Sequence, residues 1–222
     1  MEAKAWNERY AAAERVWSVE PNVWVVEVVD GLEAAPTGAA GARAARCGAP
    51  RAGSMSPGRA LDLACGEGRN AVWLAERGWR VTAVDFSAVA LNRGRAASSA
   101  VKWIEADVVT WTPRDQAAFD LVALVYLHLP PAERRTVLGT ATASLAPGGT
   151  LAVIGHDRRN LAEGVGGPQV PEILLDPGEV ADELAALDIV RAETVPRPTP
   201  DGVALDTLVV ARRPAPEPVD LR

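Results

Sequence analysis

Apolar positions along the chain repeat with two different periods. Near the N-terminus they recur at helical spacing, at Trp6, Tyr10, Ala13 and Trp17. This spacing predicts an amphipathic helix whose tryptophans pack in the core. The next apolar stretch, VWVVEVVDG at residues 23–31, is β-branched like a strand. The proline before it and the glycine at its end are typical of a helix, which we favour.

From residue 59 onward, short apolar runs alternate with amphipathic stretches. The runs predict strands at residues 60–64, 80–84, 101–106, 121–125 and 150–154. The stretches between them predict helices at residues 69–77, from Ser87 to about residue 97, and at 131–145. Gly78 is a good C-cap for the first helix, and Ser87 is a good N-cap for the second. This alternation predicts a doubly wound parallel sheet.

The C-terminal part of the core has a different pattern. Asp176 and Glu179 form a capping box that predicts another helix. Two more apolar runs, residues 189–196 and 204–212, are separated only by RPTPDG. Because this linker has no room for a crossover helix, the last two strands should pair antiparallel. We therefore expect an α/β fold with a mostly parallel seven-stranded sheet and an antiparallel last strand.

Residues 31–58 differ from the rest of the chain in composition. This stretch offers only Leu32 and Met55 as larger apolar side chains, too few to offset its ordering entropy. It predicts a mobile insertion rather than a second domain. We expect one domain over residues 1–222, consisting of an N-terminal helical segment (1–30), the insertion (31–58), an α/β core (59–213) and a tail (214–222).

Composition and charge narrow the class of protein. The chain is 48% hydrophobic and 23% charged, which is ordinary for a soluble globular protein, and its net charge of −6 argues against a nucleic-acid-binding surface. Cys47 and Cys65 make neither a disulfide scaffold nor a thiolate metal site, so no metal is expected. No secretory signal is recognisable, and the longest apolar run, residues 121–129, is too short to span a membrane. We expect a cytoplasmic protein.

The segment LDLACGEGRN, residues 61–70, joins a predicted strand to two closely spaced glycines. Gly66 and Gly68 would let a ligand approach the backbone amides of the turn, and the following helix offers its N-terminus. Asp85 follows the glycines by about 20 residues, the spacing at which an acid binds ribose hydroxyls in such sites. In open α/β sheets, ligands bind beyond the carboxyl ends of the strands, where this turn lies. The pattern therefore predicts a site for an adenosine-containing cofactor.

The residues just before these glycines discriminate between two cofactor classes. A dinucleotide site places glycine directly after the strand, so that a pyrophosphate can sit on the helix N-terminus. Here Ala64 and Cys65 hold that place. The carboxylate of Asp62 would repel a pyrophosphate but attract a cation. S-adenosylmethionine carries a sulfonium and an ammonium group, so the charge pattern favours it over a nicotinamide cofactor.

Longer motifs carry a family resemblance. They are LDLACGEGRNAVWLAERGWRVTAVDFS at residues 61–87, EAD at 105–107, LAPGGTLAV at 145–153, and the N-terminal WNERY and VWSVEPN. With them the chain resembles class I S-adenosylmethionine-dependent methyltransferases, most closely the tellurite-resistance and thiopurine-type branch. The resemblance implies a Rossmann-like fold with an N-terminal helical lid. It also implies S-adenosyl-L-methionine as cofactor and a small-molecule methyl acceptor, such as a thiol, a chalcogen oxyanion or a hydroxyl.

The resemblance also implies roles for residues around the glycine turn. Those that would line the methionine part of the cofactor, or bind its carboxylate, are Asp62, Ala64, Gly66, Gly68 and Arg69. Ala64 departs from the glycine that is common at its position, which puts the shape of the turn in doubt. Asp62 also has a structural interpretation, in which it only orders the amides of the turn.

For the adenosine part, the resemblance assigns the ribose to Asp85. Phe86 would flank the adenine, while Asp107 and the amide of Val108 would meet its ring. Two residues complete the expected site: Val125 at the cofactor's amino group and Tyr10 from the lid. Structural alternatives are a helix cap beside Ser87 for Asp85 and an ordinary loop acid for Asp107.

Both histidines of the chain follow predicted strands at the ligand edge. His128 lies in VYLHLPP and His156 in VIGHDRRN. Because an imidazole titrates near neutral pH, each is a candidate general base, and we favour His128. Positioning alone would suffice for an acceptor that is already ionised. The glycine-rich stretch after His156 is a candidate substrate loop.

The sequence thus predicts an S-adenosylmethionine-dependent methyltransferase that acts on a small molecule, with neither nucleic acid nor membrane as partner. Two alternatives remain open at this point. One is an NAD(P)-dependent oxidoreductase on a similar sheet. The other is a non-catalytic module that retains the cofactor pocket.

Overall fold

The computed structural model describes residues 3–13, 16, 18–34, 57–114 and 116–215. Seven strands form one sheet in the order β3-β2-β1-β4-β5-β7-β6. They are β1 (Arg59–Leu63), β2 (Arg80–Asp85), β3 (Lys102–Glu105), β4 (Phe119–Val125), β5 (Leu145–His156), β6 (Asp188–Thr199) and β7 (Gly202–Arg212). The first five strands pair in parallel, and β7 is antiparallel to both β5 and β6. The predicted fold class is confirmed.

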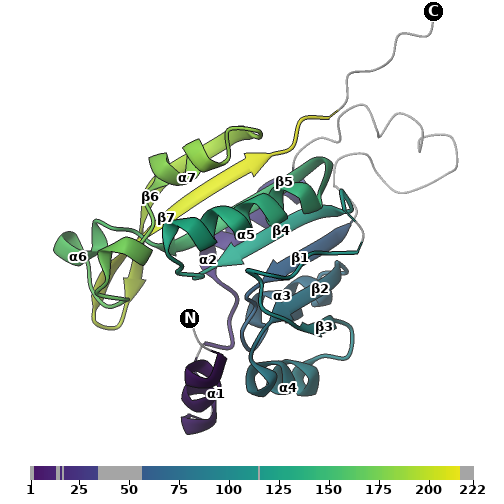
Figure 1. Ribbon diagram of the computed structural model, residues 1–222, viewed down its shortest axis with the longest axis horizontal. Helices are drawn as coiled ribbons and strands as arrows, with labels where there is room; N and C mark the ends of the chain where they lie inside the picture. The colour runs from purple at the N-terminus through teal and green to yellow at the C-terminus, as the bar shows by residue number, and fades with distance from the viewer. Residues whose placement is uncertain (1–2, 14–15, 17, 35–56, 115, 216–222) are drawn as a thin grey trace, which may run out of the picture.

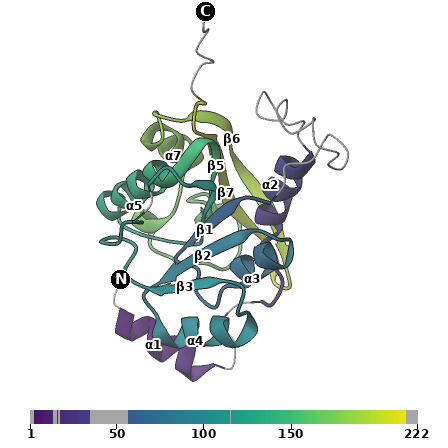
Figure 2. The same ribbon diagram turned by 90° about the vertical axis from the view of Figure 1, so that its right-hand side faces the viewer.

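Helices cover both faces of this sheet (Figures 1 and 2). Their bounds are α1 (Ala3–Ala12), α2 (Val23–Ala34), α3 (Arg69–Glu76), α4 (Ala88–Ala97), α5 (Pro131–Ser144), α6 (Asn160–Glu163) and α7 (Pro177–Glu183), with a 3-10 turn η2 (Pro171–Ile173). The core alternates along β5. Leu151 and Val153 pack with α5 and α7 on one face, while Ala152 and Ile154 pack with α2, α3 and α4 on the other. This period-2 burial is expected of a strand covered on both sides.

The stretch with mixed helix and strand signals is a helix, α2. Val25, Val28 and Val29 recur at helical spacing and are buried in the core. The helix continues to Ala34, so the predicted insertion does not begin at residue 31. Residues 35–56, which make up most of that predicted insertion, lie outside the described residues.

The order of the strands reverses between β1 and β4, and this places the candidate site. In doubly wound sheets, loops that leave neighbouring strands in opposite directions open a crevice at the carboxyl ends. Near this end, α1 lies beside α4 (Figure 1). The Ser87 hydroxyl donates a hydrogen bond of 2.6 Å to Asn7 Oδ1, and Arg93 donates to the carbonyls of Tyr10 and Ala13. The N-terminal helix is thereby held next to the crevice.

Within the described part of the chain, no helix combines the length and apolar character needed to cross a lipid bilayer.

Candidate active site

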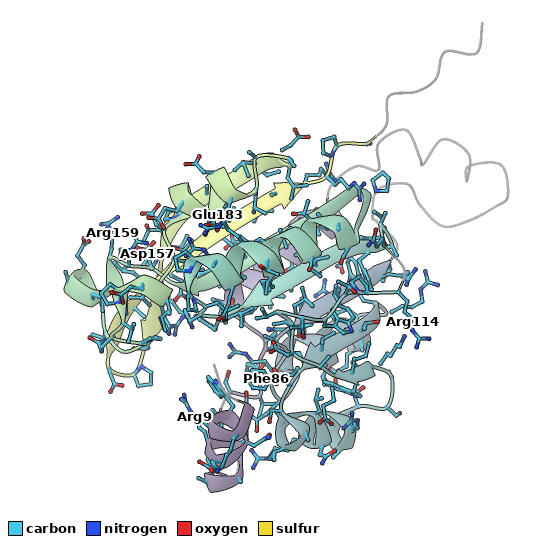
Figure 3. All side chains as sticks on the ribbon, in the orientation of Figure 1. Arg9, Phe86, Arg114, Asp157, Arg159 and Glu183 are labelled. Carbon is cyan, nitrogen blue, oxygen red and sulfur yellow. The ribbon has the colours of Figure 1, made fainter. Side chains whose placement is uncertain are left out.

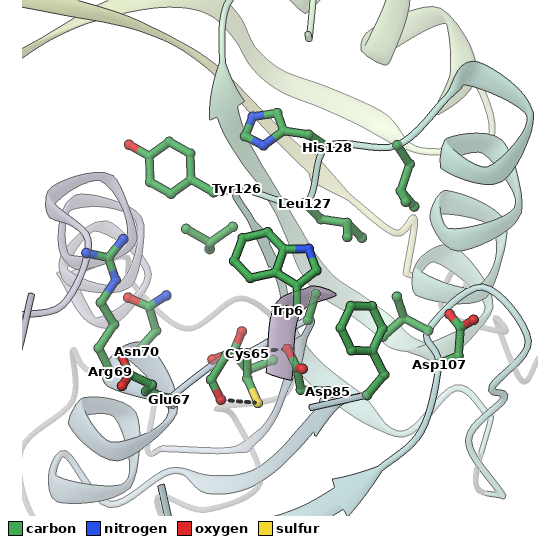
Figure 4. A pocket seen from close by; sticks show the side chains of 18 of the residues that line it. Trp6, Cys65, Glu67, Arg69, Asn70, Asp85, Asp107, Tyr126, Leu127 and His128 are labelled. Atoms are coloured by element: carbon green, nitrogen blue, oxygen red, sulfur yellow. Dashed lines mark hydrogen bonds between the residues drawn. The ribbon is translucent and has the colours of Figure 1, made fainter. Parts of the chain in front are cut away.

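A cavity lies at the carboxyl ends of β1, β2 and β4 (Figure 4). All eleven residues predicted to bind the cofactor line it, namely Tyr10, Asp62, Ala64, Gly66, Gly68, Arg69, Asp85, Phe86, Asp107, Val108 and Val125. His128 lines it as well, but His156 is not part of its wall. Further lining residues that the sequence did not single out for the site are Trp6, Cys65, Glu67, Asn70, Val109, Tyr126, Leu127, Leu129 and Glu133.

The turn after β1 forms one wall of the cavity. Ala64, Gly66 and Gly68 all have left-handed backbone conformations, with φ of 58°, 56° and 80°. A Cβ atom on Gly68 would lie 2.2 Å from the Trp103 ring, so only glycine fits there. Ala64 keeps the left-handed conformation despite its methyl group, at a cost of about 1–2 kcal/mol. The alanine therefore strains the turn without changing its handedness.

Asp62 lies at the base of this turn, and its side chain is only 1% exposed. Its Oδ2 atom is buried and has no hydrogen-bond partner among the described residues. Burial, with a smaller effect of the nearby Asp85 carboxylate, raises the pKa of Asp62 to about 7. A buried carboxylate at the wall of a cavity, with one oxygen unpaired, is stabilised by a cation placed nearby. The electrostatics of the turn thus fit a cationic ligand.

Asp85 has a structural role at the end of β2. Its two carboxylate oxygens accept hydrogen bonds of 2.8 Å from the backbone amides of Gly66 and Ser87. It therefore orders the glycine turn and the start of α4 at once. Each oxygen has a second lone pair, so this role is compatible with ribose hydroxyls. Its burial, mainly, raises its pKa.

Phe86 and Asp107, which the sequence predicts to contact the adenine, both line the cavity. Phe86 follows β2 and lies on the side of the site near α1 (Figure 3). Asp107 is exposed, and its Oδ1 accepts a 2.9 Å hydrogen bond from the Val109 amide in the loop after β3. The neighbouring Val108 is buried and lines the same cavity.

The N-terminal helix covers part of the cavity. Tyr10 is 3% exposed, and its ring centroid lies 5.7 Å from that of Trp6. Trp6 was expected in the core, but it is half-buried and lines the cavity. The reason is that α1 packs beside α4 rather than on the sheet, so its aromatic face closes the crevice. Trp17, also expected in the core, lies outside the described residues.

The segment between α1 and α2 is attached to residues of the cavity wall. Glu67 accepts a hydrogen bond from the Val16 amide, and Asn70 Oδ1 accepts one of 2.9 Å from the Asn22 amide. Arg69 donates to the Ser18 hydroxyl at 2.8 Å. Arg69, which is predicted to bind the carboxylate of the cofactor, thus also holds the segment that follows α1.

A second group of polar side chains adjoins the cavity at the ends of β4, β5 and β7. We call it the Asp206 cluster; its members are Trp24, Tyr126, His156, Arg197 and Asp206. Asp206 is fully buried. Its Oδ2 accepts hydrogen bonds from the indole of Trp24 at 3.2 Å, the hydroxyl of Tyr126 at 2.7 Å and the guanidinium of Arg197 at 2.7 Å.

Tyr126 connects this cluster to the cavity. Its φ of 57° is unusual for a bulky residue, and its amide donates to the Ile154 carbonyl at 2.7 Å. The guanidinium carbons of Arg69 and Arg197 lie 5.9 Å and 5.5 Å from its ring centroid. Backbone strain of this kind is retained where the surroundings over-determine it, often at functional sites. No local motif marked Tyr126 in the sequence.

The two histidines differ in what their nitrogens contact. His128 is 7% exposed, and its Nε2 accepts a 3.1 Å hydrogen bond from the backbone amide of His156. Burial and the neighbouring His156 lower the pKa of His128 to about 4. The rings stack with centroids 5.3 Å apart, and His156 Nδ1 faces Asp206 Oδ1 at 3.6 Å. Because the Nε2 lone pair of His128 is engaged, the geometry favours His156 over His128 as a base.

The central part of the chain is similar in sequence to known methyltransferases. Residues 60–149 match the family described as "Methyltransferase domain". An uncharacterized methyltransferase of Mycobacterium tuberculosis is 38% identical over 108 residues, which are 47% of this chain and 54% of that protein. Trans-aconitate 2-methyltransferase of Paracidovorax citrulli is 35% identical over 101 residues, 45% of this chain and 39% of that protein. The chain thus spans about half the length, or less, of these curated relatives.

A solved structure extends the likeness in fold to nearly the whole chain. The 1,6-didemethyltoxoflavin-N1-methyltransferase of Burkholderia thailandensis, solved with its substrate and S-adenosylhomocysteine, has a TM-score of 0.64 and 20% identity. The match covers 96% of this chain and 87% of that one. The comparisons thus show a likeness to methyltransferases, one of them solved with S-adenosylhomocysteine bound, and none of the proteins named here is an oxidoreductase. They do not single out the tellurite-resistance and thiopurine-type branch.

Proposed function

We propose that this protein transfers a methyl group from S-adenosylmethionine to a small-molecule acceptor. The observation that carries the proposal is the unpartnered Oδ2 of Asp62, buried at the wall of a cavity that a glycine turn opens to backbone amides. An ammonium group placed there would receive a hydrogen-bond acceptor and an opposite charge together. When bound, the cofactor would supply a methyl group activated by its sulfonium.

The chain's own residues would then bind and orient the reactants. Asp62 and Arg69 would hold the two charged groups of the methionine part, and Asp85 would hold the ribose. The adenine would lie near Phe86, Asp107 and Val108, with Tyr10 and Trp6 closing the cavity from α1. Holding the reacting groups in line is the main contribution expected for a displacement of this kind.

The acceptor would enter beside Tyr126, where the cavity meets the Asp206 cluster. The two named proteins whose substrates appear in their names, trans-aconitate 2-methyltransferase and 1,6-didemethyltoxoflavin-N1-methyltransferase, act on different small molecules, so they leave the acceptor open. The finer assignment to the tellurite-resistance and thiopurine-type branch, with a soft anionic acceptor, stays a prediction from the sequence, as does a cytoplasmic location.

The experiment that tests this function measures binding and turnover separately. Isothermal titration calorimetry should detect S-adenosylhomocysteine but not NAD. Asp85→Ala should weaken this binding by about 1–3 kcal/mol, because it leaves polar groups unpaired. As a control, Asp176→Ala removes an acid that caps α7 and should leave the affinity unchanged.

Two results would contradict the proposal. Binding of NAD in place of S-adenosylhomocysteine would favour the oxidoreductase. Binding of S-adenosylhomocysteine, with no methyl transfer in a broad acceptor screen, would favour a non-catalytic module.

A further inference from the structure

His156 and Asp206 are opposite residues in the antiparallel ladder of β5 and β7. This register brings the imidazole and the carboxylate to the same place at the end of the sheet, since directly opposed side chains of a ladder project to one face. Asp206 is 0% exposed. The pair is therefore set by the fold and not by a flexible loop.

The two oxygens of Asp206 have different surroundings. The three donors from Trp24, Tyr126 and Arg197 all point at Oδ2. Oδ1 is buried and has no hydrogen-bond partner in the described part of the chain. The three donors fix the orientation of the carboxylate, so the remaining oxygen can serve only His156.

The imidazole of His156 is similarly asymmetric. Its Nδ1 is buried without a hydrogen-bond partner among the described residues and faces Asp206 Oδ1 at 3.6 Å. The side chain nevertheless keeps 16% of its surface exposed. A Cβ atom added to Gly167 would lie 2.9–3.0 Å from the Cγ, Cδ2 and Nδ1 atoms, so the Gly167 backbone covers that side of the ring. The exposure therefore belongs to the part of the ring away from Nδ1.

These contacts determine where a neutral imidazole carries its proton. At 3.6 Å the two atoms are too far apart for a formed hydrogen bond, but the Asp206 carboxylate is the acceptor that Nδ1 faces, so its negative charge favours a proton on Nδ1 of the neutral imidazole. Nε2 then keeps its lone pair. The other charged or titratable groups around His156 are Arg197, Tyr126 and His128, and none of them offers Nδ1 a competing acceptor.

We propose that Asp206 is a positioning residue that holds His156 as its Nδ1–H tautomer, so that Nε2 can remove a proton from the methyl acceptor. This inference rests on the proposed methyltransferase function. It implies an acceptor whose reacting atom carries a proton at working pH, such as a weakly acidic hydroxyl, thiol or ring N–H.

The step balances without any further reactant. The proton of the acceptor X–H group passes to Nε2, and the electron pair of that bond forms the bond to the methyl carbon. The electron pair of the broken carbon–sulfur bond stays on the sulfur of S-adenosylhomocysteine. His156 then returns the proton to solvent.

The tautomer can be measured without knowing the acceptor, because the chain has only two histidines. Long-range proton–nitrogen correlation spectra of ¹⁵N-histidine-labelled protein at pH 8 should show His156 with its proton on Nδ1. A His156→Gln variant assigns the signals. His128, whose Nε2 accepts from a backbone amide, serves as an internal reference.

Asp206→Asn should reverse the tautomer of His156. The three donors require an oxygen at their side of the amide, which turns the NH₂ group toward Nδ1 and makes Nδ1 an acceptor. The proton then moves to Nε2, as it does when an amide replaces the carboxylate of a serine-protease triad. Asp157→Asn is a matched control, since Asp157 is equally buried but contacts Thr194 and Thr207 instead. It should leave the tautomer unchanged.

A second readout is acylation by diethyl pyrocarbonate, which requires a free imidazole lone pair. Mass spectrometry should find His156 modified before His128, and Asp206→Asn should slow the modification of His156 several-fold. A wild-type His156 with its proton on Nε2, or a tautomer that Asp206→Asn leaves unchanged, would overturn the inference. If the wild-type protein does not bind S-adenosylhomocysteine, the proposed function is contradicted instead. The tautomer measurement does not depend on that binding, so the two failures can be told apart.

Discussion

In the turn after β1, a side chain accepts hydrogen bonds from backbone amides, whereas in the Asp206 cluster the side chains bond to one another. In the turn, Asp85 fixes two amides, one of them only 19 residues before it in the chain. In the cluster, Trp24 and Asp206 are 182 residues apart. The first region is a local motif, and the second exists only when α2, the ends of β4 and β5 and the β6–β7 hairpin have come together.

This difference suits the two regions to different kinds of ligand. A turn that presents backbone amides suits a ligand that is the same throughout a family, because those amides offer the same donors whichever side chains surround the cavity. A cluster built from side chains on several strands can change one residue at a time, which suits a variable acceptor. Four experiments test this division between the two regions.

The largest effect is expected at the acceptor end. His156→Gln removes the proposed base, so kcat on an acceptor that carries a proton should fall by roughly 10²–10⁴-fold. The affinity for S-adenosylhomocysteine should stay unchanged, because His156 is not part of the cavity wall. Initial rates and calorimetry measure the two quantities. His128→Gln should cost less, and an equal loss in both variants would show that the histidines act through packing.

The next effect lies in the turn itself. Gly68→Ala combines a left-handed conformation, worth about 1–2 kcal/mol, with a steric clash against Trp103, worth about 1–3 kcal/mol. The free energy of unfolding should therefore fall by about 2–5 kcal/mol in urea denaturation. Gly148→Ala is the matched control, since Gly148 has a φ of 78° and nothing within 4 Å of an added Cβ. Equal losses would mean that Trp103 yields to the methyl group.

A smaller effect should appear in the pH dependence of cofactor binding. The raised pKa of Asp62, about 7, means that the carboxyl is mostly protonated at pH 6 and mostly ionised at pH 8. Because a cationic ligand favours the ionised form, the affinity for S-adenosylhomocysteine should fall about tenfold from pH 8 to pH 6. In the unliganded protein, pH acts on stability in the opposite direction. Between pH 4 and 7 the folded state keeps the Asp62 proton that the unfolded state has lost, so the free energy of unfolding should decrease as pH rises through this range. Asp62→Asn should abolish both trends; a trend that persists would assign the proton to another group.

The smallest effect concerns Ala64. Its φ of 58° is a conformation that glycine adopts freely and alanine does not. Ala64→Gly should raise the free energy of unfolding by about 1 kcal/mol, somewhat less than the strain it relieves because glycine also gains freedom in the unfolded chain. Chemical denaturation measures this change. A destabilised variant would show that the methyl group contributes packing that outweighs its strain.

The same division explains how far the sequence could predict the site. The glycines after β1 and the acids in the last residues of β1 and β2 lie at short, regular spacings, so their meeting at one cavity could be foreseen from local pattern. The alternation of strands and helices likewise predicted the parallel sheet, and the short linker predicted the antiparallel pair. Assigning each lining residue its ligand contact stays a prediction.

The parts that pattern could not provide depend on packing between distant elements. Helical spacing predicted that Trp6 packs in the core. This prediction was wrong because α1 packs on α4, which nothing in the sequence indicates. Spacing also gave no reason to prefer His156 over His128, since the preference comes from where one backbone amide points. One signal was available for Asp206: a lone carboxylate within an apolar strand costs free energy unless it has partners.

The hydrogen bond between Trp24 and Asp206 also bears on when the site can form during synthesis. At about 5–20 residues per second, a ribosome adds the 182 residues between them in roughly 10–40 s. Asp85, whose side chain accepts from the Gly66 amide, is only 19 residues further on and is synthesised about 1–4 s after Gly66. The nascent chain can thus close the turn while β4, β5 and β7 are still missing. The groups that would handle the acceptor's proton come together last.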